Sequence, residues 1–230
     1  MQRKKYRMGG LGNTSSWAGS LKKIPCFIIG NGPFLNKVDL KILEDYFTIG
    51  INRAFLKIDP TILIWQDLAL WLQHKKQIKK LKAIRYCRRA SATGADKICY
   101  YFNMTGRDSR LSGDPGMLYG RGSSGPLGFQ LAFALGCNPI ILVGMDCKYD
   151  KKGNTDFYGK NPMHRPHTLV SCKAGLKWIK KFERKRKILN CSKNKIFEER
   201  LSIEEVIEII GKDKALGREK FTKKILKNKV

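Results

Sequence analysis

The sequence predicts a single α/β domain in which helices flank a mostly parallel sheet. Two apolar runs, at residues 24–30 and 47–51, are each followed by an Asn, a pattern typical of strands that end at a ligand crevice. A third stretch, residues 121–146, contains a Gly/Ser turn, an apolar helical segment, a Gly and another apolar run. This order is that of the repeating units of a parallel sheet. A chain of 230 residues buries one substantial core, so we expect one domain.

Apolar, β-branched segments bounded by Gly, Pro or Asn define the strands. The first segment is closed by Gly-Asn-Gly-Pro, which ends a strand in a turn, and the second repeats the pattern with a single Asn. On the same grounds we expect strands at residues 24–30, 47–51, 61–66, 83–87, 97–102 and 139–144, and a short one at 188–191.

Helical segments are marked by their caps and by apolar residues at helical spacing. Asp67 stands before a run that we expect to be helical as far as residue 81. Ser202 and Glu205 form a capping box before a strongly apolar run. The expected helices are residues 38–46, 67–81, the segment that follows the Gly/Ser turn and ends at Gly136, 173–189 and 203–210.

Composition divides the chain into a core domain and two basic extensions. Residues 1–23 contain Gly and Ser and lack periodicity, as is typical of a flexible arm. We expect the ligand-binding domain at residues 24–192, and a helical basic extension at 193–230 whose tail is frayed or bound to a polyanion. Two polar loops inside the domain, 103–122 and 147–173, are long enough to be functional.

The net charge of +27 is the most unusual property of the composition. Residues 75–89 hold eight Lys or Arg and no acid, and residues 160–195 hold twelve against the single Glu183. A charge of this size attracts polyanions: nucleic acid, anionic lipid surfaces or phosphorylated substrates. A solvated basic surface without a partner is the alternative, and the sequence leaves both open.

Seven cysteines lie mostly in or beside apolar runs, and none forms a Cys-x-x-Cys pair. An odd number in such positions favours reduced core thiols over disulfides or a zinc site. No apolar stretch approaches the roughly 20 residues that span a bilayer, and the basic N-terminus has no hydrophobic signal core. We therefore expect a cytoplasmic protein without a membrane span.

Turns at strand and helix ends carry groups suited to binding phosphate. Gly30 and Gly32 allow the backbone to approach a phosphate or a ribose, and Asn31 between them offers both a donor and an acceptor. Ser123 and Ser124 precede a helix, whose unpaired N–H groups and dipole favour an anion. Because the carboxyl ends of parallel strands lie at one edge of a sheet, we expect these turns at one crevice.

Four motifs, in this order, resemble glycosyltransferase family 42, the bacterial sialyltransferases, and related Rossmann-like domains of the DUF115 type, which include an archaeal pterin pyrophosphokinase. They are Gly30-Asn31-Gly32-Pro33; Ile51-Asn52-Arg53; Arg121-Gly122-Ser123-Ser124-Gly125 with Gly144-x-Asp146; and His167-Thr168 before a helix. The resemblance covers residues 24–179, about two thirds of the chain. It implies a Rossmann-like, GT-A-like domain; a phage-encoded member would act in the host cytoplasm.

The resemblance implies transfer of a sugar from a CMP- or UDP-linked donor to a hydroxyl group, without a cofactor and without a metal. The donor-binding residues would be Asn31, Gly32, Asn52, Gln66, Arg121, Ser123, Ser124, Gly144 and Asp146. His167 would deprotonate the acceptor hydroxyl, while Tyr158 and either Lys148 or Tyr149 would stabilise the departing phosphate. The residues expected to contact the acceptor are His164, Arg165, Lys177 and Lys180.

The chain departs from the family pattern at three positions. Cys147 replaces an aromatic residue, Lys148 takes the place of the first tyrosine, and Gln66 takes that of an asparagine. These changes leave the nucleotide and the sugar open, but they do not affect the glycine turns or the histidine.

Elementary chemistry favours the same loop. Attack by a hydroxyl on an activated sugar needs a base with a pKa near neutrality, such as His, and groups that neutralise phosphate, such as Tyr, Lys and Arg. No Asp-x-Asp pair occurs, so a divalent metal is not demanded. The charge predicts a polyanionic acceptor, such as a hydroxymethylated base in DNA or an anionic glycan. The alternatives are a nucleic-acid-binding protein on a nucleotide fold, and a pterin-type pyrophosphokinase that uses ATP and magnesium.

Overall fold

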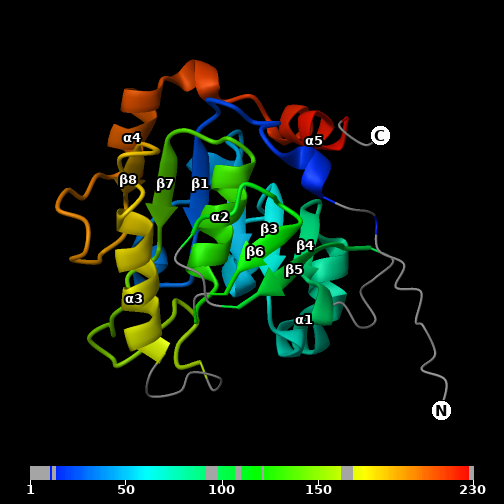
Figure 1. The fold of residues 1–230 in the computed structure, drawn as a ribbon. Coiled ribbons are helices and arrows are strands. Elements are labelled where there is room, and N and C mark those ends of the chain that lie inside the picture. The colour runs from blue at the N-terminus through cyan, green and yellow to red at the C-terminus, as the bar shows by residue number, and fades with distance from the viewer. Residues whose placement is uncertain are drawn as a thin grey trace, which may run out of the picture.

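The structure, a computed structural model, describes residues 11, 14–91, 98–106, 110–120, 122–161 and 168–227. These residues form one eight-stranded sheet with helices on both faces (Figure 1). The strand order is β6-β5-β4-β3-β2-β1-β7-β8, and every neighbouring pair is parallel. The predicted fold class, a Rossmann-like α/β domain with a mostly parallel sheet, is thus confirmed.

The elements lie close to their expected positions. The strands are β1 (Cys26–Ile29), β2 (Thr48–Ile51), β3 (Ile62–Trp65), β4 (Ile84–Arg88), β5 (Tyr100–Thr105), β6 (Met117–Tyr119), β7 (Ile140–Val143) and β8 (Ile188–Asn190). The α-helices are α1 (Leu68–Lys80), α2 (Gly125–Ala134), α3 (Thr168–Lys180), α4 (Ile203–Ile210) and α5 (Arg218–Leu226). Among them, none is long and apolar enough to cross a membrane.

Three segments differ from expectation. β6 lies in the expected loop 103–122, because a three-residue strand is too short to show periodicity. The expected helix 38–46 contains only a single 3-10 turn at Lys41–Leu43. In place of the expected helix 173–189, α3 ends at Lys180, and a series of turns connects it to β8. Like charges crowded one turn apart disfavour a longer helix.

The expected flexible arm is packed where the structure describes it. Trp17 and Leu21 are fully buried. The Trp17 ring lies 4.8 Å from that of Tyr100 and 5.8 Å from that of Tyr86, measured between ring centroids. Burial of a large aromatic ring outweighs the loss of chain entropy in this short segment. Trp17 and Leu21 therefore anchor residues 14–23 to the core, whereas 1–10 and 12–13 lie outside the described residues.

The C-terminal tail also packs on the sheet, contrary to the expectation that it is frayed. Phe221 of α5 is 1 % exposed, and its ring lies 5.4 Å from that of Phe47. Arg218 forms a salt bridge of 2.9 Å with Asp59. The capping box predicted at the start of α4 is present, and Val206 of that helix is fully buried.

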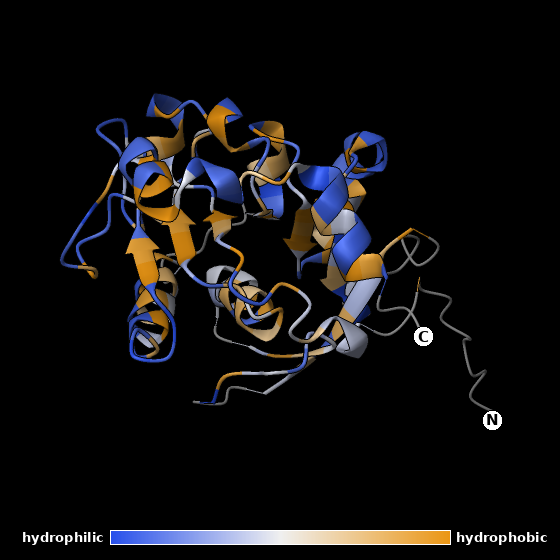
Figure 2. Cartoon of the chain, turned by 90° about the horizontal axis from the view of Figure 1, so that it is seen from above, coloured by the Kyte–Doolittle hydropathy of each residue, from blue (hydrophilic) through white to orange (hydrophobic). Residues whose placement is uncertain are grey.

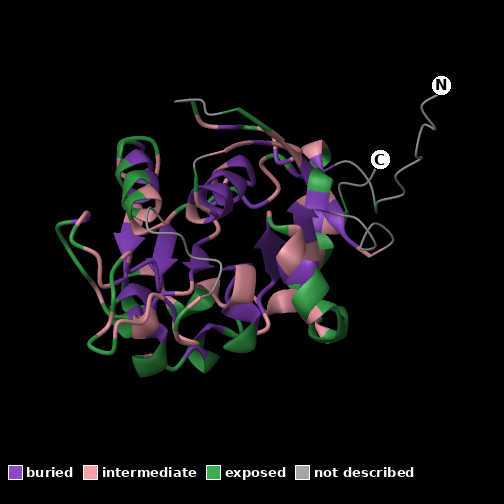
Figure 3. Cartoon of the chain, turned by 90° about the horizontal axis from the view of Figure 1, so that it is seen from below, coloured by how far each residue is buried: buried purple, intermediate pink, exposed green. Residues whose placement is uncertain are grey.

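Alternating side chains of the strands divide the core between the two faces. Ile28 points to the face covered by α2, α3, α5 and the N-terminal segment, whereas Phe27 and Ile29 point to the face covered by α4. Trp65 packs against α1 on this second face. The strands of the sheet are mostly hydrophobic, and most of their residues are buried between the helices (Figures 2 and 3). Strands covered on both faces account for the continuous apolar runs in the sequence.

The strand order reverses beside β1. From β1 the chain adds β2 to β6 in one direction, then crosses back to place β7 and β8 on the other side of β1 (Figure 1). Ligands of open parallel sheets bind at the carboxyl ends of the strands where the order reverses. Topology therefore places a candidate site after β1 and β7.

Candidate functional site

A pocket of about 440 Å³ opens where topology places it. Its walls come from the turns after β1, β2, β3 and β7 and from α2 and α3, so the expected common crevice is present. The volume lies within the ~300–1,000 Å³ usual for small-molecule sites. The predicted donor-binding residues that line the pocket are Asn31, Gly32, Asn52, Gln66, Ser123, Ser124, Gly144 and Asp146. Arg121 lies outside the described residues.

Glycines bring the ends of β1 and β7 together at this pocket. The Gly32 N–H donates to the Gly144 carbonyl oxygen at 2.7 Å, and the Gly30 N–H donates to that of Val143 at 2.8 Å. A Cβ atom on Gly30 would lie 2.5 Å from the Gly144 carbonyl oxygen. Gly144 has a φ of +65°, which L residues rarely adopt. The turn at residues 30–32, which we expect to approach a ligand, therefore needs glycine for a second reason: its backbone packs directly against the end of β7.

Asp146 holds the walls of the pocket. Its two carboxylate oxygens accept backbone N–H bonds, from Phe34 at 2.8 Å and from Lys193 at 2.9 Å. The residue is 3 % exposed. Asp146 therefore ties the segment after β1 to the segment after β8, and its direct contact with a donor stays a prediction.

Asn31 and Asn52 place two unpaired acceptors in the pocket wall. The Asn31 Nδ2 donates to the Ile51 carbonyl oxygen at 2.9 Å, and the Asn52 Nδ2 donates to the Ser124 Oγ at 3.3 Å. Both Oδ1 atoms are buried and have no hydrogen-bond partner among the described protein atoms. An unpaired buried acceptor costs about 1–3 kcal/mol. Asn52 also has a φ of 51°, and such strain is common at binding sites.

Hydrogen bonds from the Asn52 and Gln66 side chains to Ser124 hold the start of α2 in place. Ser124 occupies the N-cap position, but its side chain makes no capping bond. Its Oγ instead accepts from the Gln66 Nε2 at 3.0 Å, in addition to Asn52. A Cβ atom on Gly175 would lie 2.8 Å from the ring of Pro126, so α3 packs closely against this helix start. Among the described residues the Ser124 side chain thus leaves the helix start uncapped, while the Leu127 and Gly128 N–H groups donate to the Ser124 carbonyl oxygen at 3.1 and 3.2 Å.

Tyr158 lines the pocket from the loop after β7, where two groups fix its hydroxyl. Arg53 Nη1 donates to it at 3.1 Å and Asn161 Nδ2 at 3.0 Å. Arg53 also stacks on the ring and donates to His74 Nε2 at 3.1 Å and to Gln73 Oε1 at 2.6 Å, both on α1. Burial, assisted by a nearby carboxylate, raises the pKa of Tyr158 to about 12. The phenol therefore keeps its proton at neutral pH.

Arg53 is the candidate residue that the sequence reasoning overlooked. It lines the pocket and joins Tyr158 to α1, although the motif Ile51-Asn52-Arg53 gave it no role. A cation directly after a strand-end Asn was the available signal. The pocket also contains Cys147 and Cys172, which the sequence assigned to no site.

Two further predicted catalytic residues, Lys148 and Tyr149, do not line the pocket, and the predicted residues of the 164–167 segment are not described. Lys148 and Tyr149 are exposed, Tyr149 by 58 %, and neither lines the pocket. His164, Arg165 and His167 lie outside the described residues. No cluster of three or more His, Cys, Asp or Glu suited to a metal occurs within the described ranges.

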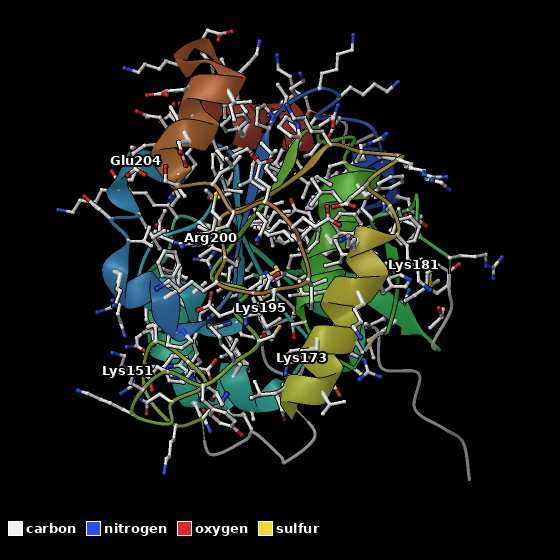
Figure 4. The ribbon with its side chains drawn as sticks, turned by 90° about the vertical axis from the view of Figure 1, so that its left-hand side faces the viewer. Lys151, Lys173, Lys181, Lys195, Arg200 and Glu204 are labelled. Carbon is white, nitrogen blue, oxygen red and sulfur yellow. The ribbon has the colours of Figure 1, made fainter. Side chains whose placement is uncertain are left out.

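The predicted acceptor-binding lysines lie on a separate basic surface. Lys177 and Lys180 line a second cavity, of about 570 Å³, together with Lys195. Lys180 is partly engaged, because its Nζ bonds Glu198 at 3.2 Å and the Ile196 carbonyl oxygen at 3.0 Å. Lys173 of α3 and Lys181, which directly follows this helix, lie on the same side of the molecule as Lys195 and Arg200 (Figure 4).

The two basic stretches lie toward opposite ends of the sheet. Residues 75–89 form the end of α1 and β4, whereas α3 lies at the β7 end of the sheet (Figure 1). Leu70 of α1 and Leu176 of α3 both line the pocket.

No protein-family model matches the chain, and no curated protein matches it. Similar solved structures include the sialyltransferase CstII from Campylobacter jejuni in complex with the substrate analogue CMP-3FNeuAc, at 14 % identity over 73 % of this chain and 80 % of that chain, with a TM-score of 0.43. CstII in complex with cytidine-5'-monophosphate is 15 % identical over 85 % of this chain and 87 % of that chain, with a TM-score of 0.43. A mutant of alpha-2,3/8-sialyltransferase CstII is 15 % identical over 72 % of this chain and 80 % of that chain, with a TM-score of 0.40. A likeness of this degree carries no conclusion about activity.

Proposed function

We propose that the chain is a metal-independent glycosyltransferase and that the pocket binds its nucleotide-sugar donor. The observation that carries the proposal is the pair of buried acceptors, Asn31 Oδ1 and Asn52 Oδ1, unpaired among the described atoms at the carboxyl ends of β1 and β2. Ribose hydroxyls and the amino group of a cytosine-type base are the donors that such acceptors match. The sequence motifs around these residues support the same proposal.

The donor phosphate would sit at the Ser123–Ser124 turn. Here the helix dipole favours an anion, and the Ser124 side chain does not cap the helix start. Tyr158 borders the same pocket as a protonated phenol, so its hydroxyl is suited to stabilise the phosphate as it departs.

In the proposed reaction the bond between the sugar and the nucleotide phosphate breaks as the acceptor hydroxyl attacks the sugar carbon. The hydroxyl proton passes to His167, and the phosphate leaves with the electron pair. Lys148 or Tyr149 would assist Tyr158 only if the segment after β7 turns toward the pocket, because both residues are exposed in this structure.

Thermal unfolding in the presence of CMP, UDP, GDP or ATP tests the donor site. We expect CMP or UDP to stabilise the chain by about 2.7 kcal/mol at 100 times the dissociation constant. This corresponds to a rise in melting temperature of roughly 5–10 °C for a chain of this size. Asn52→Ala should reduce the rise, because the pocket loses one of its two unpaired acceptors.

Stabilisation by ATP with magnesium alone would contradict the glycosyltransferase and favour the pyrophosphokinase alternative. Absence of stabilisation by any nucleotide would contradict a nucleotide pocket. Density for a soaked nucleotide away from the Ser123–Ser124 turn would contradict the placement of the phosphate.

We propose further that the acceptor is polyanionic and that Lys177 and the lysines of 75–89 bind it. If the chain contacts 6–10 phosphates of DNA, raising the salt concentration from 50 to 200 mM should weaken its binding by about 10³–10⁵-fold. Filter binding across this salt range measures the effect, and Lys177→Glu should reduce the salt slope. Lys212→Glu, near the end of α4 and away from both stretches, is the matched control.

If the affinity for polyanions does not depend on salt, or if no polyanion binds, the proposal is wrong and these lysines form only a solvated surface. Binding to DNA that needs neither nucleotide nor His167, without any transfer, would favour the non-catalytic nucleic-acid-binding alternative.

A further inference from the structure

Two cysteines from separate segments meet at the wall of the pocket. Cys147 follows the strand-end Asp146, and Cys172 lies in the second turn of α3. Both residues line the pocket and are partly exposed. Their thiols form a hydrogen bond with each other. The structure therefore places two free thiols in contact at a surface that solutes can reach.

The backbone holds each thiol in place. Cys147 has a φ of 50°, a conformation rare for L residues, which aims its side chain from the turn after β7. On α3, Thr168, Cys172 and Leu176 are spaced four residues apart, share one helix face, and all line the pocket. Both side chains therefore face the same pocket from separate segments.

The hydrogen bond makes the two thiols chemically different. It lowers the pKa of Cys172, against the opposing effect of burial, because the Cys147 thiol stabilises the Cys172 thiolate. The same bond, together with burial, raises the pKa of Cys147. A thiolate is the reactive form of cysteine, so the lowered pKa favours Cys172 as the thiol that reacts first.

We propose that Cys147 and Cys172 are a redox-sensitive dithiol that peroxides convert into a disulfide joining the β7 wall of the pocket to α3. The Cys172 thiolate attacks hydrogen peroxide, forming a sulfenic acid and releasing hydroxide. The Cys147 sulfur then attacks the sulfenic sulfur, so that an S–S bond forms and an S–O bond breaks. Overall two thiols lose two hydrogens and the peroxide becomes two water molecules.

The chain supplies a matched control pair. Cys26 and Cys137 also form a hydrogen bond between their side chains, but both residues are fully buried in the core beside the N-terminal segment. If contact between the thiols were sufficient, peroxide would oxidise both pairs at the same rate. If access from the pocket is also needed, peroxide should oxidise only Cys147 and Cys172.

The experiment treats the reduced full chain with hydrogen peroxide, alkylates the remaining thiols and maps the bridges by peptide mass spectrometry. Trypsin leaves Cys137 and Cys147 in one peptide, residues 122–148, so fragment ions between them are needed to assign the bridge. We expect a bridge from Cys147 to Cys172, five alkylated cysteines and reversal by dithiothreitol. The bridge closes a loop of about 25 residues, and the melting temperature should rise by roughly 5 °C or more.

Variants assign the order of the steps without reference to any enzymatic activity. In Cys147→Ser, dimedone should trap a sulfenic acid on Cys172, whereas Cys172→Ser should give no adduct at position 147. The proposal is overturned if the wild-type chain forms no bridge at peroxide levels that oxidise free cysteine, or if Cys26 and Cys137 bridge equally fast. Because the readout is a covalent bond, its failure is distinct from failure of the proposed transferase.

Discussion

Replacing His167 with Ala is expected to lower turnover by about 10²–10⁴-fold while nucleotide binding stays unchanged. This is the contribution typical of a general base, which acts on the transition state and not on the bound donor. The neighbouring residue in the chain, Thr168, is the first residue of α3 and lines the pocket. A base attached directly to a fixed helix start gains a defined orientation, which favours His167 over His164.

Steady-state kinetics with a nucleotide sugar and a hydroxylated acceptor measures the effect, and thermal shift with the nucleotide alone checks that binding is retained. His164→Ala is the comparison: because His164 is expected to contact the acceptor, this variant should raise the KM for the acceptor but keep turnover within a few-fold of the unmodified chain. If His164→Ala loses turnover and His167→Ala keeps it, the two roles are exchanged. If both variants keep it, the catalytic role of this loop is wrong.

Replacing Gly30 with Ala is expected to destabilise the chain by about 2–3 kcal/mol, which lowers the melting temperature by roughly 4–12 °C. The new Cβ atom would lie 2.5 Å from the Gly144 carbonyl oxygen and 3.0 Å from its carbonyl carbon. Both are backbone atoms at the end of β7, so relief requires β1 and β7 to separate. The separation occurs where the pocket forms, so the stabilisation by nucleotide should fall as well.

Gly113→Ala provides the matched control, because a Cβ atom there meets no heavy atom within 4 Å. Thermal unfolding of the two variants isolates the effect of the contact from the effect of removing a glycine. Equal stability of Gly30→Ala and Gly113→Ala would show that β1 and β7 do not approach each other as described.

Local patterns were sufficient for the strands and for the turns that end them. The runs that became β1, β2, β3 and β7 are buried throughout and almost entirely apolar because both faces of the sheet are covered, so each was visible without knowledge of its neighbours. The capping box of Ser202 and Glu205 was equally local. Once these strands are parallel, Asn31 and Asn52 must lie at one edge, and the common pocket followed from that rule.

Local patterns failed wherever a contact joined distant segments. Trp17 stands in a basic, aperiodic stretch, yet it packs against Tyr86 and Tyr100. Phe221 lies in a lysine-rich tail and packs on Phe47. Neither burial has a periodic signal, because a single aromatic residue inserted into an existing core needs no amphipathic neighbours.

The sequence by itself determined the parallel α/β class, the glycine turns and the set of polar groups at the strand ends. Only the tertiary structure decided which partners those groups have: that Asp146 is occupied by two backbone N–H groups, that Arg53 holds Tyr158, and that Cys147 meets Cys172. The reason is physical. Strand formation depends on hydrophobic periodicity within a few residues, whereas each of these pairings is fixed by side-chain geometry between segments far apart in the chain.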